Sequence, residues 1–116
     1  MHIKTKQIEP LGFKGSGMYD HAPSYNHYYR KDKKNSCIIG VTQLYPPTVF
    51  SFHLTKKQFT EFEAGKLSLV PPGCCNASGG KHIDHDKCTV HHEGEIKNMK
   101  HLKEILDQVE AFYQAL

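Results

Sequence analysis

Hydrophobic and polar residues are ordered along this chain in a way that predicts several short strands. Over residues 49–54 the two kinds alternate, so Phe50, Phe52 and Leu54 fall on one face of a strand. Residues 36–44 form the most continuous apolar stretch, which is typical of a strand at the centre of a sheet. Weaker patterns predict strands over residues 2–8, 25–31, 67–70 and 89–93, and loops over residues 11–24 and 73–87.

A short helix is predicted over residues 56–64 by the residues at its two ends. Thr55 and Gln58 have the spacing of a capping box, in which each side chain accepts a hydrogen bond from the backbone of the other residue. Gly65 follows the last helical residue and can adopt the left-handed conformation that commonly ends a helix. These local signals delimit the helix on both sides.

The C-terminal segment has the period of an amphipathic helix. Asn98 is a favourable N-cap, and the helix is expected to run over residues 99–115. Its apolar residues recur at intervals of four and three in one stripe: Leu102, Leu106, Val109, Tyr113 and Leu116. Ile105 and Phe112 lie beside that stripe, where they would pack against the same sheet or against a second copy of the chain.

Together these elements predict one α+β domain over residues 1–116. The expected core is an antiparallel sheet of four to five strands, with the C-terminal helix across one face and the short helix at an edge. The other face of the sheet is expected to stay partly free. Because the sequence shows neither an apolar secretory leader nor a stretch with the apolar length of a membrane span, a cytoplasmic location is expected.

The two halves of the chain differ in charge. The net charge is +3 with neutral histidines, which is too small to indicate a nucleic-acid partner. Residues 1–58 contain nine Lys/Arg and three Asp/Glu, whereas residues 59–116 contain six and nine. This asymmetry indicates either a solvated surface with uneven charge or a basic face that meets an acidic protein surface.

Aromatic and cationic residues gather in the first half of the chain. Residues 18–30 contain four tyrosines, two histidines and one arginine. Tyrosine and arginine combine a large contact area with a polar group and are enriched at interface hot spots. Along a strand these side chains alternate between two faces, so one face is expected to be exposed. The predicted partner-binding residues are Tyr19, Tyr25, His27, Tyr28, Tyr29 and Arg30. The alternative is that the tyrosines pack over the sheet with their hydroxyls at its rim.

Cysteine and histidine are concentrated between residues 74 and 101, which hold three of the four cysteines and five of the nine histidines. Cys37 lies outside this segment, in an apolar stretch, and is expected to fill the core. Without a secretory leader the cysteines are expected to be thiols. Zinc is held by such side chains, although the spacing here matches no standard finger. The candidate ligands are Cys75, His82, His85, Cys88 and His91. A cysteine nucleophile beside a histidine and an exposed polar loop are the other interpretations of this segment.

The favoured function is that of a small non-catalytic protein-binding or regulatory domain, inhibitor-like or adaptor-like. Its interface would be the strand and loop rich in tyrosine, histidine and arginine. The expected partner is another protein with an acidic surface, and the C-terminal helix suggests a homodimer as well. No standard catalytic motif is present, so no catalytic residue is assigned. The alternative is a metal-dependent or Cys/His enzyme with its site in residues 74–101. No cofactor is expected except for zinc in that segment, and no membrane partner is expected.

Overall fold

The computed structural model describes residues 3–16, 27–43, 46–72 and 81–116 of the chain. Its elements follow one another in this order: α1 (Thr5–Ile8), the 3₁₀ turn η1 (Glu9–Leu11), β1 (Lys14–Ser16), β2 (His27–Asp32), β3 (Cys37–Thr42), β4 (Thr48–His53), α2 (Lys56–Glu63), β5 (Leu67–Leu69), β6 (Lys81–Ile83), the 3₁₀ turn η3 (His85–Lys87), β7 (Thr89–Glu93) and α3 (Met99–Gln114). Five strands form one antiparallel sheet in the order β1-β2-β3-β4-β7. The predicted α+β fold class is therefore confirmed.

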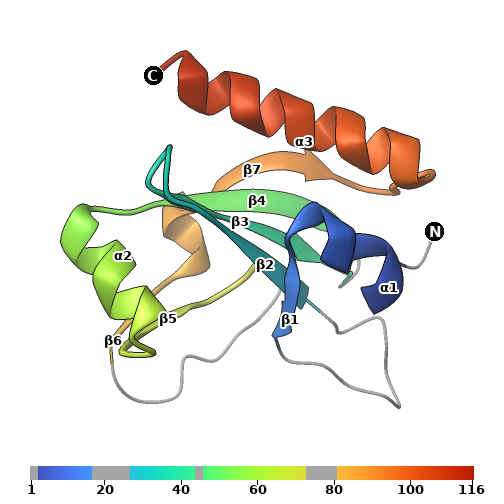
Figure 1. The fold of residues 1–116 in the computed structure, drawn as a ribbon. Coiled ribbons are helices and arrows are strands. Elements are labelled where there is room, and N and C mark those ends of the chain that lie inside the picture. The colour runs from blue at the N-terminus through green and yellow to red at the C-terminus, as the bar shows by residue number, and fades with distance from the viewer. Residues whose placement is uncertain (1–2, 17–26, 44–45, 73–80) are drawn as a thin grey trace.

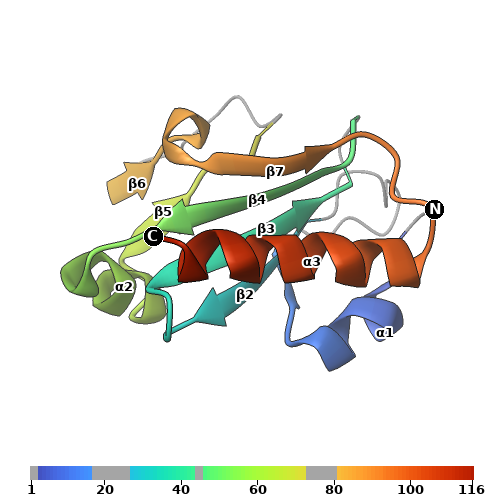
Figure 2. The same ribbon diagram turned by 90° about the horizontal axis from the view of Figure 1, so that it is seen from above.

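The main sheet is the middle layer of three. Helix α3 lies across one face of the sheet, while α2 and the parallel pair of β5 and β6 lie on the other side (Figure 1). Seen from above, α3 runs over the middle strands, with β7 at one edge and α1 near the opposite edge (Figure 2). None of the helices in the described ranges is long and apolar enough to cross a membrane.

The central strands β3 and β4 supply apolar side chains to both faces of the sheet. Every residue of β3 is buried, and every residue of β4 except His53 is buried. Because successive side chains of a strand point to opposite faces, each strand contributes to two cores. Ile39, Val41 and Val49 face α3, whereas Ile38, Phe50 and Phe52 face the opposite layer.

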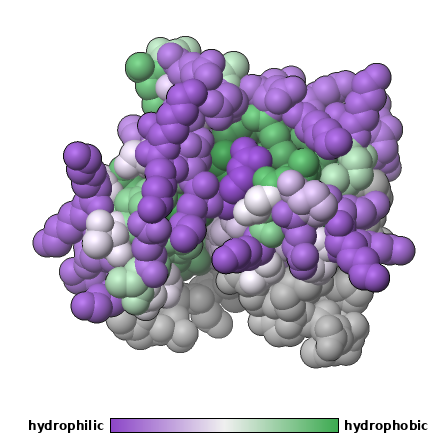
Figure 3. All heavy atoms as spheres, viewed as in Figure 1, coloured by the Kyte–Doolittle hydropathy of each residue, from purple (hydrophilic) through white to green (hydrophobic). Residues whose placement is uncertain are grey.

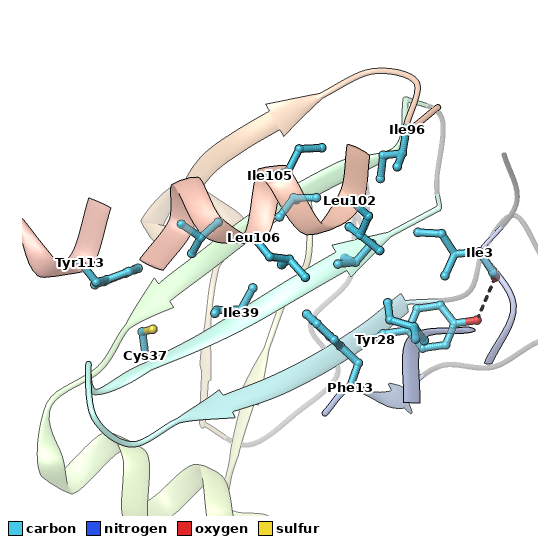
Figure 4. Packing of buried hydrophobic residues seen from close by; sticks show 14 residues of the cluster. Ile3, Phe13, Tyr28, Cys37, Ile39, Ile96, Leu102, Ile105, Leu106 and Tyr113 are labelled. Carbon is cyan, nitrogen blue, oxygen red and sulfur yellow. Dashed lines mark hydrogen bonds between the residues drawn. The ribbon is translucent and has the colours of Figure 1, made fainter. Parts of the chain in front are cut away.

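The α3 core is the apolar cluster between the sheet, α1 and α3 (Figure 4). Its members are Ile3, Ile8, Phe13, Tyr28, Cys37, Ile39, Val41, Val49, Ile96, Leu102, Ile105, Leu106, Val109 and Tyr113. Helix α3 begins as predicted, because the side-chain oxygen of Asn98 accepts a hydrogen bond from the His101 amide at 2.8 Å. The two apolar residues beside the predicted stripe differ in burial. Ile105 is only 2% exposed, whereas Phe112 is 39% exposed. Cys37 is fully buried, as expected for a core cysteine.

The α2 core covers the opposite face of the sheet. It consists of Ile38, Phe50, Phe52, Leu54 and Phe59, with partly buried residues from β5 and β6 packed against it. The expectation that this face stays partly free holds only beside β1 and β2, where Tyr29 is half-buried and Lys31 is exposed, because β3 and β4 are covered. Two large aromatic rings of β4 point to this side, and leaving such rings in water would cost roughly 1.5–3 kcal/mol each. The layer formed by α2, β5 and β6 removes these rings from water.

The N-terminal segment departs from its prediction. Instead of a strand over residues 2–8, the chain forms α1 at Thr5–Ile8. The side-chain oxygen of Gln7 accepts a hydrogen bond from the Lys4 amide at 3.0 Å, which caps the first turn. Ile3 and Ile8 are both buried members of the α3 core. The helical turn between them therefore directs both side chains towards that core.

Two short strands occur inside segments that were predicted to be loops. Strand β1 lies within residues 11–24 and pairs with β2, and β6 lies within residues 73–87 and pairs with β5. Both strands are three residues long. A segment of that length contains too few residues to show an alternating pattern, so these strands depend on their distant partners.

The start of α2 offers a direct test of the predicted capping box. The Gln58 amide donates to the Thr55 hydroxyl at 3.1 Å, and the Thr55 amide donates to the Gln58 side-chain oxygen at 2.9 Å. We expect T55A to lower the free energy of unfolding by roughly 0.5–2 kcal/mol, because an amide of the first turn loses its acceptor. Urea unfolding measures this loss. T60A, at an exposed position within the same helix, is the control; it removes no cap and should leave the free energy of unfolding unchanged or slightly raised, because alanine has the higher helix propensity.

The contact between Gly40 and Phe50 offers a second test. The two residues are register partners in β3 and β4, and a Cβ atom at position 40 would overlap the ring of Phe50. We expect G40A to lower the free energy of unfolding by about 1–3 kcal/mol, because the added methyl group overpacks the α2 core. In the double variant G40A/F50L the smaller side chain makes room for it. A loss equal to the sum of the two single losses would contradict the steric explanation.

Candidate functional site

Strand β2 carries four of the six predicted partner-binding residues, while Tyr19 and Tyr25 lie outside the described residues. Tyr28 is only 1% exposed and belongs to the α3 core. Its hydroxyl donates to the Ile3 carbonyl at 3.3 Å, as the dashed line in Figure 4 shows. The assignment of Tyr28 to an interface is therefore wrong, because α1 and α3 cover the face of β2 on which its ring lies.

Arg30 is half-buried and holds together elements of the domain. Its Nη1 donates to the Leu11 carbonyl at 3.0 Å, and its guanidinium lies 5.1 Å from the centre of the Phe13 ring. Both contacts reach the segment between α1 and β1. The guanidinium therefore connects this segment to β2, which leaves less of Arg30 available for a partner than the sequence suggests.

His27 and Tyr29 lie on the other face of β2. Their ring centres are 6.4 Å apart, and the Tyr29 ring meets the edge of Phe50 at 6.0 Å. The Tyr29 hydroxyl donates to the Leu69 carbonyl at 3.4 Å. Burial lowers the pKa of His27, so its imidazole is neutral at pH 7.

A groove of about 570 Å³ opens beside Tyr29, between β1, β2, α2 and β5. This volume is within the range of ligand-binding clefts. The apolar part of its wall is formed by Tyr29, Phe62, Leu67 and Leu69. Lys14, Lys31 and Glu63 form the charged part. The groove therefore combines aromatic and aliphatic surface with an excess of positive charge.

Glu63 offsets only part of the positive charge around the groove. Its carboxylate lies 3.4 Å from the ammonium groups of both Lys31 and Lys33. Desolvation raises the pKa of Glu63, but hydrogen bonds from the two lysines outweigh it and hold the pKa below its ordinary value. All three side chains are partly exposed, so these ion pairs contribute little to stability. Lys14 makes no ion pair with any residue of the described ranges.

The proposed zinc ligands are not brought together. Cys75 lies outside the described residues, and His85 is described only by its backbone in η3. His82 lies on β6 beside Asp84, and Cys88 packs against the α2 core. His91 faces the α3 side, so the sheet separates it from Cys88. In the described part of the chain, no group of three or more His, Cys, Asp or Glu residues could hold a metal ion. Of the predicted ligands, His91 is therefore separated from Cys88, while a site that includes Cys75 or His85 stays a prediction.

An irregularity in β7 explains the position of His91. The register with β4 passes from Val90 to His92 and skips His91, which is the arrangement of a β-bulge. Both histidines consequently contact α3. The His91 ring lies 5.1 Å from the Phe112 ring, and the His92 ring lies 5.2 Å from the His101 ring. The sequence shows the two adjacent histidines, but it contains no signal for the bulge.

Ser51 links His91 to α3. Its hydroxyl lies 2.7 Å from Nε2 of His91 and 2.5 Å from the hydroxyl of Tyr113. Burial lowers the pKa of His91 and raises that of Tyr113, so both groups are neutral at pH 7. A serine next to a neutral histidine resembles a catalytic pair, but Ser51 is 0% exposed and cannot meet a substrate in this conformation. The contacts of Ser51 with His91 and Tyr113 hold α3 against the sheet.

The two described cysteines are poor nucleophiles. Burial, together with the nearby carboxylate of Asp32, raises the pKa of the Cys37 thiol to about 12. Burial also raises the pKa of Cys88. Both groups are therefore thiols at pH 7, whereas the reactive form of cysteine is the thiolate. Neither supports the Cys/His enzyme that the sequence left open.

The chain was compared with protein-family models, with curated proteins and with solved structures, and none of them matches it. The functional interpretation therefore depends on the surfaces of this molecule alone. Among the described residues, the groove beside Tyr29 combines apolar walls with an excess of positive charge, and a second hollow of about 480 Å³ beside Phe52 and His53 is lined by Asp84, Asp86 and Lys87.

The buried histidines make the stability of the fold dependent on pH. His27 and His91 have a lowered pKa in the folded state, so the unfolded chain binds more protons as the pH falls below about 6.5. We expect the free energy of unfolding to be highest above that pH and to fall on acidification towards pH ~5. In H91Q the loss should be smaller, because one of the two buried imidazoles is absent.

Urea unfolding at a series of pH values measures this dependence. T55A, which lowers stability without removing a titratable group, is the control and should keep the pH dependence of the wild type. If H91Q and T55A have the same pH dependence, His91 does not titrate on unfolding and the expectation is wrong.

Proposed function

We propose that this domain is a non-catalytic protein-binding module and that the groove between β1, β2, α2 and β5 is its interface. The observation that supports the proposal is the placement of Tyr29 and Phe62 in the wall beside the charged groups of Lys14 and Lys31. Aromatic walls provide contact area for an inserted side chain, and the lysines favour a partner with acidic residues next to it. The preferred ligand is an acidic segment of another protein that carries an apolar side chain.

The proposal keeps the class of function expected from the sequence but moves the interface. Tyr28 and Arg30 make contacts inside the domain, and of the four predicted residues on β2 only Tyr29 lines the groove. The groove also explains how the basic first half of the chain contributes, because Lys14 and Lys31 both come from it.

The enzyme hypothesis for residues 74–101 gains no support from the described residues. His91 and Cys88 lie on opposite sides of the sheet, and the thiol of Cys88 has a raised pKa. Ser51, the hydroxyl nearest to a histidine nitrogen, is fully buried. A binding groove with polar and apolar walls needs none of these groups.

A short capped peptide with acidic residues on both sides of a central phenylalanine is a suitable probe for the groove. NMR titration should shift the amide signals of Gly15, Tyr29 and Leu69, which line the groove. We expect K14E/K31E to weaken binding of this peptide by about tenfold, because the charges beside the groove are reversed.

The matched control is K100E/K103E, which makes the same change of charge on α3, on the opposite side of the sheet. This variant should bind the peptide as the wild type does. A second peptide with lysine in place of the acidic residues should not bind. Equal affinity of the wild type and K14E/K31E, or shifts confined to α3, would show that the groove is not the interface.

A further inference from the structure

A carboxylate of the protein itself already lies in the charged part of the groove. Among the described residues that line the groove, Glu63 is the acidic one. Its Oε2 atom lies 3.4 Å from Nζ of Lys31 and 3.4 Å from Nζ of Lys33. One anionic oxygen is therefore held between two ammonium groups, which marks the place where the groove stabilises a negative charge.

The charged side chains come from separate elements that meet at the groove. Lys31 lies two residues after Tyr29 on β2, so both side chains are on the α2 side of the sheet, and Lys14 joins them as the register partner of Tyr29. Lys33 belongs to the turn that follows β2, and Glu63 is the last residue of α2. Figure 3 shows hydrophilic side chains beside α2, with hydrophobic surface visible between them. Charged groups therefore border the apolar wall of the groove.

The ion pairs of Glu63 are weak enough to be exchanged. The side chain of Lys31 is 47% exposed, that of Lys33 is 72% exposed and that of Glu63 is 31% exposed. Ion pairs between such side chains add little to stability, because water screens them and both partners lose rotational freedom. Since the backbone of Glu63 is held in α2, its side chain can turn into solvent without moving the helix.

We propose that Lys31 and Lys33 form the anion-binding subsite of the groove, that Glu63 occupies this subsite in the free protein, and that an acidic side chain of the ligand displaces it. The inference rests on the function proposed above and assigns the place of one acidic residue of the bound segment. Glu63 turns into solvent on binding, because two carboxylates beside the same ammonium groups repel each other. Lys14, which has no ion pair in the described ranges, receives a second acidic residue without competition.

This competition sets how tightly the groove binds an acidic ligand. The ligand binds to molecules whose subsite is open, so the apparent dissociation constant is the intrinsic constant divided by the open fraction. Removal of the competitor should therefore raise the affinity by the factor that the occupied state withholds. Because the ion pairs of Glu63 are partly exposed, we expect this factor to be small, about fivefold.

Binding of the acidic phenylalanine peptide to E63Q tests the proposal. Glutamine keeps the length and shape of the side chain but removes its charge. We expect E63Q to bind the peptide about fivefold more tightly than the wild type in the same NMR titration. E61Q is the matched control, because it makes the same change in the same helix, where Glu61 pairs with Lys81 at 2.8 Å and neither residue lines the groove. This control should bind as the wild type does.

A combination of E63Q with K31Q/K33Q separates displacement from general repulsion. Once both lysines are neutral, the carboxylate of Glu63 is no longer held in the groove and turns into solvent. In that background E63Q should therefore change the affinity by less than about twofold. An equal gain in both backgrounds would show that Glu63 repels the peptide from a distance, and the proposal would be overturned.

The occupied subsite can also be measured without a ligand. Although desolvation raises the pKa of Glu63, hydrogen bonds from Lys31 and Lys33 hold this pKa below its ordinary value. In K31Q/K33Q the pKa should rise towards the ordinary value of a glutamate, which carbon-13 NMR of the carboxyl group detects. If the pKa is the same in both proteins, Glu63 is not bound by the lysines in solution and the proposal is wrong.

The titrations distinguish this proposal from the one on which it rests. If the wild type binds the peptide and E63Q binds it no more tightly than E61Q does, the competition is overturned and the groove remains the interface. If neither the wild type nor E63Q binds, the groove is not the interface and both proposals are wrong. Binding by E63Q alone would support both, because the competitor then keeps the subsite occupied in the wild type.

Discussion

The apolar character of both faces of β3 and β4 is the constraint on which the rest of the structure depends. A strand that buries side chains on two sides needs a layer on each, and the other elements provide those layers. Helix α3 and the N-terminal turn cover one face, and α2 with β5 and β6 covers the other. Gly40 lies at the centre of this arrangement, because the absence of its side chain makes room for the ring of Phe50.

The bulge in β7 connects this layered core to the surface. By skipping His91 in the register, it turns His91 and His92 towards α3. His91 reaches Ser51 and, through it, Tyr113, so a polar contact holds the C-terminal half of α3 on the sheet. The His92 ring meets the His101 ring near the start of the same helix. Two histidines of the segment in which the sequence suggests a metal site thus help to position a helix.

The groove proposed for binding exists because the second layer covers only part of the sheet. Helix α2 and the pair of β5 and β6 pack on Ile38, Phe50 and Phe52 and leave a gap beside β1 and β2. The wall of this groove carries Tyr29 and two lysines from the basic half of the chain, which favour an acidic partner through charge.

The sequence by itself determined the elements whose signals are local. The capping box of Thr55 and Gln58, the N-cap Asn98 and the stripe along α3 depend on residues close together in the sequence. The capping box and the N-cap are confirmed, and the stripe is confirmed as far as Tyr113, whereas Leu116 follows the end of α3 and is 74% exposed. Alternation also identified β4, and the continuous apolar stretch over residues 36–44 identified the central position of β3. Only the tertiary structure decided the pairing of β5 with β6, the burial of Tyr28 and the direction in which His91 points. These features depend on contacts between residues far apart in the chain. A residue type at one position carries no information about which distant element will cover it, so the groove and the bulge appear only when the layers are assembled.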